Sequence, residues 1–253
     1  MDIMWWLSSL LAVAIGVSLG WLGGGGSILT VPVLVYVVGQ SPAAAVTTSL
    51  AVVGLNAVFG SWLRWRNGTV QWRSALIFGG VGILGATLGS QFTHLVPGVI
   101  LLVLFALLML VVAGLMLRSP KRPKVDQPIE PSWLKVGLAG LGVGILTGFL
   151  GVGGGFLIVP ALVMLVGLGM GEAIATSLPI IALNSAAGLA GHLGQGGLDW
   201  SVTLRFVALG AVGMAVGITL ARRTSPEGLR RAFAWFVIGV AVCMLLRSLP
   251  QLI

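Results

Sequence analysis

The second half of this 253-residue chain repeats the pattern of the first half at a constant shift, so that residue 20 aligns with residue 148. The stretch "GWLGGGGSILTVPVL" at 20–34 corresponds to "GFLGVGGGFLIVPAL" at 148–162. Further along, "TTSLAVVGLNAVFG" at 47–60 corresponds to "ATSLPIIALNSAAG" at 175–188, and the agreement continues through Trp72 and Trp200. A chain duplicated in this way is expected to fold into two similar units, each interrupted by its own glycine run.

Each half divides into five apolar segments, which lie at roughly 3–22, 26–39, 43–63, 74–93 and 97–117, then 134–150, 155–168, 172–191, 202–221 and 229–249. Charged residues make up 8% of the chain, against about 25% in soluble domains. The chain is therefore expected to be a multi-pass membrane protein in a lipid bilayer. Crossing a hydrocarbon core of ~30 Å takes about 20 residues. The segments 26–39 and 155–168, which follow the glycine runs, are too short to span comfortably, since about 14 helical residues reach only ~21 Å.

The predicted fold is all-α, with a first repeat at 1–117, a cytoplasmic linker at 118–132 and a second repeat at 133–253. Each repeat opens with a glycine-broken helical hairpin, either re-entrant or spanning. Basic residues favour the cytoplasmic side. A hairpin followed by three crossings per half places 12 of the 14 Lys and Arg on one face and only Arg205 and Arg247 on the other. This layout inverts the second repeat, an arrangement typical of transporters, and leaves both termini outside the cytoplasm.

Few groups suited to catalysis are present. No acidic residue lies in the middle of an apolar segment, and the single cysteine, Cys243, allows neither an internal disulfide nor a cysteine-based metal site. We therefore expect no enzymatic activity, no catalytic residues, no metal and no cofactor. The net charge of +8 would suggest nucleic acid in a soluble protein. Here the basic residues lie in short loops, so the charge reports membrane topology and no nucleic-acid partner is expected.

The glycine runs are candidates for an anion site. A helix broken at membrane depth leaves backbone amides unpaired, which is tolerated only where they face protein or a cavity. Amides at a helix N-terminus carry partial positive charge and suit an anion. We expect the two glycine tips to meet near the midplane with a small anionic substrate between them, its charge met by dipoles rather than by a buried Arg or Lys. Tight helix packing alone is the alternative role for these glycines.

Small neutral polar residues recur beside the glycine runs. Ser49 and Asn56, like Ser177 and Asn184, are seven residues apart and so share one helix face. Their alternative role is hydrogen bonding between helices. The predicted substrate-binding residues are thus Gly23, Gly24, Gly25, Gly26, Ser27, Thr48, Ser49 and Asn56 in the first half, and Gly151, Gly153, Gly154, Gly155, Thr176, Ser177 and Asn184 in the second.

The duplicated pattern G-x-x-G-x-G-G-[GS]-x-x-x-x-P-x-L, followed in each half by "TSL" and an asparagine, resembles the TauE/SafE sulfite exporter family, also called the toluene sulfonate uptake permease family. The resemblance covers essentially the whole chain. It implies secondary transport of sulfur-containing anions such as sulfite, organosulfonates or thiosulfate across a bacterial inner membrane, through about eight helices. Val152 replaces Gly24 and Gly155 replaces Ser27 across the repeat, so the site is not expected to be symmetric.

A non-transporting membrane subunit of a sulfur-metabolism system is the alternative function. It predicts no stabilisation by a ligand. The sequence fixes neither the oligomeric state nor the coupling ion, because lipid-facing surfaces are apolar in every case.

Overall fold

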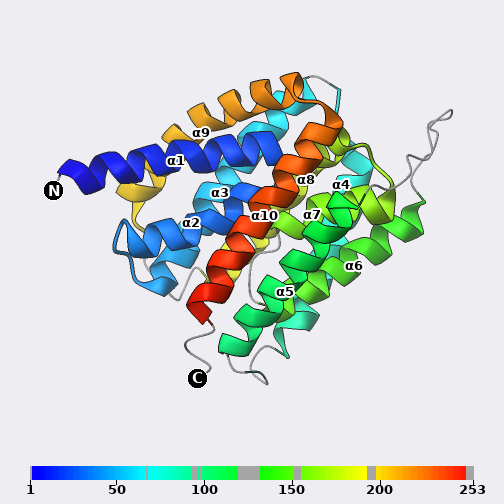
Figure 1. The fold of residues 1–253 in the computed structure, drawn as a ribbon, viewed down its shortest axis with the longest axis horizontal. Coiled ribbons are helices and arrows are strands. Elements are labelled where there is room, and N and C mark those ends of the chain that lie inside the picture. The colour runs from blue at the N-terminus through cyan, green and yellow to red at the C-terminus, as the bar shows by residue number, and fades with distance from the viewer. Residues whose placement is uncertain are drawn as a thin grey trace.

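The computed structural model describes residues 2–66, 68–92, 96, 98–118, 132–150, 155–192 and 198–248. Within these ranges every regular element is a helix (Figure 1). The elements are α1 Asp2–Leu22, α2 Gly25–Tyr36, α3 Pro42–Trp65, α4 Trp72–Ser90, α5 Gly98–Leu117, α6 Trp133–Leu150, α7 Gly155–Ala161, the π-helix η2 Leu162–Val166, α8 Met170–His192, α9 Trp200–Arg223 and α10 Pro226–Ser248.

Helix lengths agree with the apolar segments expected from the sequence. In the described part of the chain, 8 helices are long and apolar enough to cross a membrane, and the two shorter apolar helices are Gly25–Tyr36 and Gly155–Val166. The prediction of two short arms after the glycine runs is therefore confirmed, as is the all-α multi-pass architecture. The linker at 118–132 lies outside the described residues except at its two ends, Arg118 and Ser132.

Local sequence signals account for several helix ends. The hydroxyl of Ser41 accepts a hydrogen bond from the amide of Ala44 at the start of α3, where Pro42 follows as a favourable first residue. The carboxylate of Asp199 accepts from the amides of Ser201 and Val202 at the start of α9. The C-terminal end of η2 is defined by Gly167, whose left-handed φ of 85° favours glycine.

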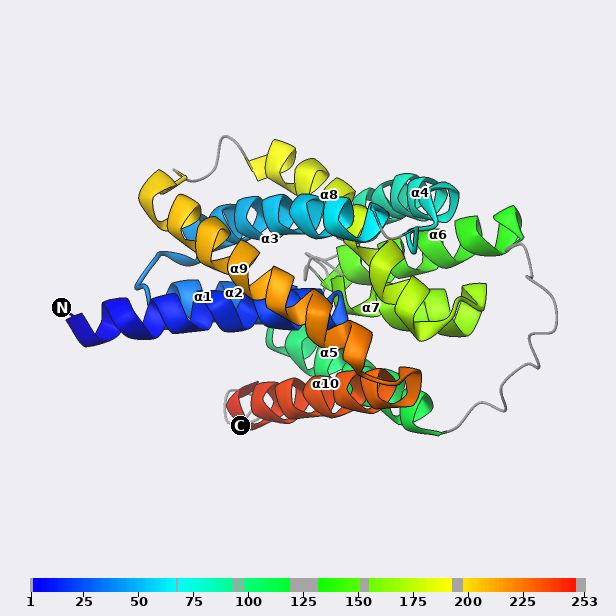
Figure 2. The same cartoon turned by 90° about the horizontal axis from the view of Figure 1, so that it is seen from above.

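The most extensive helix–helix contacts join helices of the first half of the sequence to helices of the second half. Helix α1 packs along α9, α4 along α6 and α5 along α10, as Figure 2 shows from above. Close approach needs glycine at matched positions. A Cβ on Gly213 of α9 would meet backbone of Val13, and a Cβ on Gly85 of α4 would meet backbone of Leu141. These two contacts are equivalent under the 128-residue shift, because 13 maps to 141 and 85 maps to 213.

The equivalent helices α3 and α8 pack against each other in opposite directions. A Cβ on Gly60 would meet Leu178, whereas a Cβ on Gly188 would meet Leu50. The 128-residue shift converts one of these contacts into the other, since residue 50 is equivalent to residue 178 and residue 60 to residue 188. Both pairs of contacts are therefore reproduced when each residue is replaced by its equivalent in the other half.

The fourth helix of each half is exchanged, so the sequence halves are not separate packing units. Helix α9 packs on α1 and α3, and α4 packs on α6 and α8. We call α1, α2, α3 and α9 the first unit, and α4, α6, α7, η2 and α8 the second unit. Helices α5 and α10 form a pair at the side of both, as Figures 1 and 2 show.

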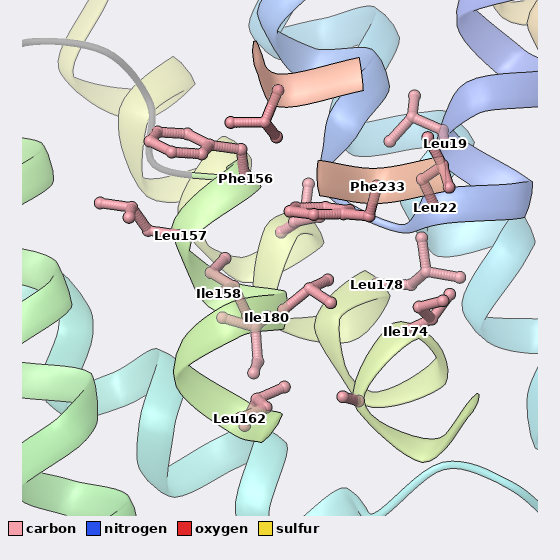
Figure 3. Close-up of a cluster of buried hydrophobic side chains, with 14 of the residues drawn as sticks. Leu19, Leu22, Phe156, Leu157, Ile158, Leu162, Ile174, Leu178, Ile180 and Phe233 are labelled. Carbon is pink, nitrogen blue, oxygen red and sulfur yellow. The ribbon is translucent and has the colours of Figure 1, made fainter. Parts of the chain in front are cut away.

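The core is centred on the short helix α7, which is buried along its whole length. Figure 3 shows Phe156, Leu157, Ile158 and Leu162 surrounded by apolar side chains from α1, α8 and α10. The ring of Phe156 also meets Phe105 of α5 edge-on, with ring centroids 5.1 Å apart. Because α7 is covered on every side, the broken helix of the second half lies inside protein rather than against lipid.

Candidate functional site

The helix break of the first half is centred on Gly23. Helix α1 ends at Leu22, and the amide of Gly23 donates to the carbonyl of Leu19 over 2.9 Å. Gly23 has a φ of 78°, a left-handed conformation that strains residues with a side chain. Helix α2 then begins at Gly25, and its first-turn amides have no acceptor within the helix. The predicted residues Gly151, Gly153 and Gly154 of the second break lie outside the described residues.

Five of the predicted residues come together at the break. A Cβ on Gly23 would lie 2.7 Å from the hydroxyl of Ser177, and a Cβ on Gly24 would meet the backbone of Gly155. The hydroxyl of Ser27 donates to the carbonyl of Gly24 over 2.7 Å and lies against Gly155. Ser27 and Gly155 are equivalent residues of the two halves, so the two glycine tips touch at matched positions.

This contact changes the expected position of an anion. The space directly between the tips is filled by the backbones of Gly24 and Gly155. An anion reaching the α2 amides in this conformation would have to lie beside the contact. The remaining two glycines of the first run have packing roles: a Cβ on Gly26 would lie 2.5 Å from the carbonyl oxygen of Ile15, and one on Gly25 would lie 3.1 Å from the ring of Phe236.

The predicted threonines and serines have different surroundings. The hydroxyl of Ser177 donates to the carbonyl of Ile174 over 2.9 Å while facing Gly23. Thr176, one residue earlier, accepts a hydrogen bond from the amide of Gln71 over 3.2 Å and so does not face the break. Thr48 is fully buried, and its hydroxyl has no hydrogen-bond partner. Ser49 is buried on the same helix.

The two predicted asparagines carry unsatisfied polar atoms. Asn56 is fully buried in α3, and neither its amide nitrogen nor its oxygen has a partner. It lies against Gly210 of α9, where a Cβ would come within 2.5 Å of the Asn56 nitrogen. Asn184 of α8 is half-buried, with its oxygen enclosed and unpartnered. An unmade hydrogen bond of this kind costs about 1–3 kcal/mol, which is unusual for residues with a purely structural role.

Arg64 is a buried charge that the sequence interpretation missed. We expected it in a cytoplasmic loop and expected no buried Arg or Lys near the anion. Instead it occupies the last turn of α3, is 7% exposed, and its Nη2 donates to the carbonyl of Gly20 over 2.7 Å. The loop expectation fails because α3 continues two residues beyond the apolar segment and α1 packs against its end. The sequence did offer one indication: Arg64 follows the apolar segment 43–63 directly, so a helix that continues past this segment includes it.

The electrostatics differ at the other end of α1. Arg205 of α9 donates to the hydroxyl of Ser8 over 3.1 Å and lies 5.1 Å above the ring of Trp5. Its charge is thus engaged by α1 far along the helix from the break. Among the described residues, no group of three or more His, Cys, Asp or Glu side chains lies close enough to hold a metal ion. The groups near the break are backbone amides, the hydroxyls of Ser27 and Ser177 and, one helical turn away, the Arg64 guanidinium.

These features define a class: a multi-pass α-helical membrane protein in which the starts of two short helices, α2 and α7, touch inside the protein. The chain belongs to the TauE/SafE sulfite exporter family, whose sequence model matches residues 8–244. The resemblance drawn from the duplicated glycine motif is therefore confirmed over nearly the whole chain.

Relatives carry names that agree with this assignment. A "Probable membrane transporter protein" of Xylella fastidiosa is 38% identical over 245 residues, covering 94% of each chain. A protein of the same description from Methanocaldococcus jannaschii is 26% identical over 242 residues, covering 87% of this chain and 89% of its own. YdhB of Bacillus subtilis, also named a probable membrane transporter protein, is 24% identical over 207 residues. The family and these names indicate a membrane transporter rather than an enzyme.

Proposed function

We propose that this protein is a secondary transporter of small sulfur-containing oxyanions such as sulfite, organosulfonates or thiosulfate. The observation that carries the proposal is a broken helix buried in an apolar interior, with Ser27 and Ser177 beside it. Polar backbone at such depth is tolerated where it is buried in protein or lines a cavity, and in this proposal the break becomes accessible to the anion when the two tips separate. The membership in the sulfite exporter family supports the same class of substrate.

The anion is bound by dipoles at the start of α2. The first-turn amides of Gly25, Gly26 and Ser27 point out of the helix N-terminus and favour negative charge. Gly23 lets the ligand approach the backbone, and the hydroxyls of Ser27 and Ser177 supply further donors once they leave their present acceptors. In this proposal the contact between Gly24 and Gly155 represents an occluded, substrate-free state, and binding requires the two tips to separate.

Transport proceeds by alternating access between inverted repeats. The opposite directions of the equivalent helices α3 and α8 support an inverted relation, because a two-fold axis across spanning helices lies in the membrane plane. Because α4 and α9 each pack with helices of the other half, the moving bodies differ from the two sequence halves. Halves that share their fourth helices do not rock as intact repeats, so we infer that the first unit moves against the second unit along the α3–α8 contact.

The membrane orientation follows from the basic helix ends. In Figure 2 the ends of α3 and α9, which carry Arg64, Arg222 and Arg223, lie toward one side, while α1 begins and α10 ends toward the other. Basic residues favour the cytoplasmic face. We therefore propose a multi-pass protein of a bacterial inner membrane with both termini outside the cytoplasm.

Thermal stabilisation of the purified full-length protein tests the substrate class. Sulfite, thiosulfate, taurine, sulfoacetate and sulfate are compared as ligands, followed by uptake of the stabilising anion into proteoliposomes. We expect at least one sulfur oxyanion to raise the melting midpoint, and Gly25→Leu and Gly154→Leu to abolish uptake. Gly142→Leu is a matched control, because a Cβ at Gly142 meets nothing within 4 Å. If no anion stabilises the protein and both variants take up anion normally, the proposal is wrong and a non-transporting subunit is favoured.

A further inference from the structure

Arg64 is the one charged side chain among the described residues that is buried. Its Nη2 atom is bound to the carbonyl of Gly20, while its Nε atom is enclosed and has no partner. An ionised side chain inside a membrane protein is costly and is ordinarily paired or directed at a functional path. The recorded partner here is a neutral carbonyl, so the positive charge of Arg64 has no negative group bonded to it in the described structure.

Capping of α1 accounts for only part of this arrangement. Helix α1 ends at Leu22, so the carbonyl of Gly20 is one of the last four carbonyls of the helix. These four accept no hydrogen bond from an amide of the same helix. One guanidinium N–H satisfies it. A guanidinium carries five N–H donors in a planar fork suited to oxyanions. Any residue that caps a carbonyl could serve the helix end, whereas the enclosed Nε–H of Arg64 still lacks an acceptor.

The surroundings of Arg64 add positive charge rather than cancel it. Arg222, in the last turn of α9, lies close enough for the two guanidinium charges to repel each other. The indole of Trp21, next to Gly20, donates to the hydroxyl of Thr224 just beyond α9 and holds the two helix ends together. The neighbouring ends of α3, α9 and α10 carry Arg64, Arg66, Arg222, Arg223, Arg230 and Arg231 against a single acidic residue, Glu227. An anion is therefore attracted to this end of the protein.

We propose that Arg64 is the cationic contact for the transported anion at the basic end, binding it through Nε as it passes to or from the helix break. Gly20 lies one helical turn before Gly23, so a guanidinium anchored on its carbonyl is held next to the break. This inference rests on the proposed function, and it adds a full charge to a site otherwise built from dipoles.

The site is charged asymmetrically. The 128-residue shift aligns Arg64 with His192, so the second half has no arginine at this position. An arginine stays protonated at all physiological pH values. The basic end of the path therefore keeps a permanent positive charge at a position whose equivalent in the second half is a histidine.

Kinetics of sulfite and thiosulfate uptake into proteoliposomes test this role with Arg64→Gln, Arg64→Lys and the control Arg66→Gln. Arg66 is exposed and lies over the ring of Trp62 at 5.5 Å, so its loss should change KM by less than about twofold. Loss of a charged hydrogen bond predicts a KM about tenfold or more higher for Arg64→Gln. Arg64→Lys retains the charge and should recover part of this loss. Melting midpoints of all variants report on folding.

The outcomes distinguish failure of the role proposed for Arg64 from failure of the proposed transport function. A raised KM for Arg64→Gln with partial recovery in Arg64→Lys supports the inference. Equal loss of maximal rate and melting midpoint in both variants, with KM unchanged, means that Arg64 only caps α1 and overturns it. Uptake of neither anion by the unmodified protein contradicts the proposed function itself rather than the role of Arg64 alone.

Discussion

Gly24→Ala is the sharpest test of the contact between the two glycine tips. Gly24 has φ of −63° and ψ of −11°, which alanine adopts without strain, so the backbone conformation itself is not disturbed. The new Cβ would meet the carbonyl group of Gly155 and lie 2.8 Å from the amide nitrogen of Phe156. All of these are backbone atoms and have no side-chain rotation by which to yield. The alanine therefore forces the two tips apart.

The size of the effect follows from this geometry. Ordinary van der Waals contact begins at 3.4 Å, so the Phe156 nitrogen must move by at least the difference from 2.8 Å, or about 0.6 Å, and the closer carbonyl group of Gly155 must move further. Overpacking of this kind costs about 1–3 kcal/mol. If the contact is the occluded intermediate of transport, the same energy slows turnover by roughly 5–150-fold. Anion affinity should stay the same or improve, because the separated, binding-competent state is favoured.

Proteoliposome uptake and equilibrium binding of sulfite measure the two quantities independently. Gly80→Ala is the control, since Gly80 is exposed within α4 and a Cβ there meets nothing within 4 Å. We expect the control to match the unmodified protein in both assays. A Gly24→Ala protein that folds and transports within about twofold of the unmodified rate would refute the reasoning, because an occluded contact of this geometry cannot absorb a methyl group unchanged.

Three further predictions address the packing. Gly144→Ala puts a Cβ against the Gly82 backbone and should lower the melting midpoint by about 2–10 °C, whereas Gly142→Ala on the same helix should leave it within about 2 °C; equal effects would contradict the α4–α6 contact. Asn56→Leu removes an unsatisfied amide and should raise the midpoint while lowering uptake about tenfold; unchanged uptake would assign Asn56 to packing. With the native cysteine replaced by serine, cysteines are placed at Gly54 and Ser185, where a Cβ on Gly54 would lie 3.0 Å from that of Ser185. A slight separation of the helices reaches the spacing of about 3.8 Å that a disulfide needs, and this disulfide should arrest transport until it is reduced.

The helical segments were predictable because each depends on residues close together in the sequence. The short arm expected at 26–39 is α2, Gly25–Tyr36, and the segment expected at 202–221 lies within α9, Trp200–Arg223. Runs of apolar residues between charged or glycine-rich stretches suffice to define such elements. The contact between Gly24 and Gly155 was expected from the duplication only in combination with the loop charges, because a repeated sequence alone does not bring its two copies together.

The individual roles of the candidate residues were less predictable. Gly23 and Gly26 look alike in the sequence, yet Gly23 supplies a left-handed turn facing Ser177 while Gly26 lets α2 pack on α1. Thr176 and Ser177 are adjacent, but only Ser177 faces the break. Neighbouring positions on a helix point in directions about 100° apart, so which of them faces a ligand depends on where the partner helix lies.

The sequence by itself determined a duplicated, multi-pass helical protein with a glycine break in each half, because composition, segment length and repetition are properties of the chain alone. The tertiary structure decided that α4 and α9 are exchanged between the halves and that Arg64 is buried against Gly20. Both outcomes arise from contacts between residues distant in the sequence: 44 residues separate Arg64 from Gly20. Apolar helices of similar length offer many possible partners, and only the fit of glycine backbones against one another selects which of them pack together.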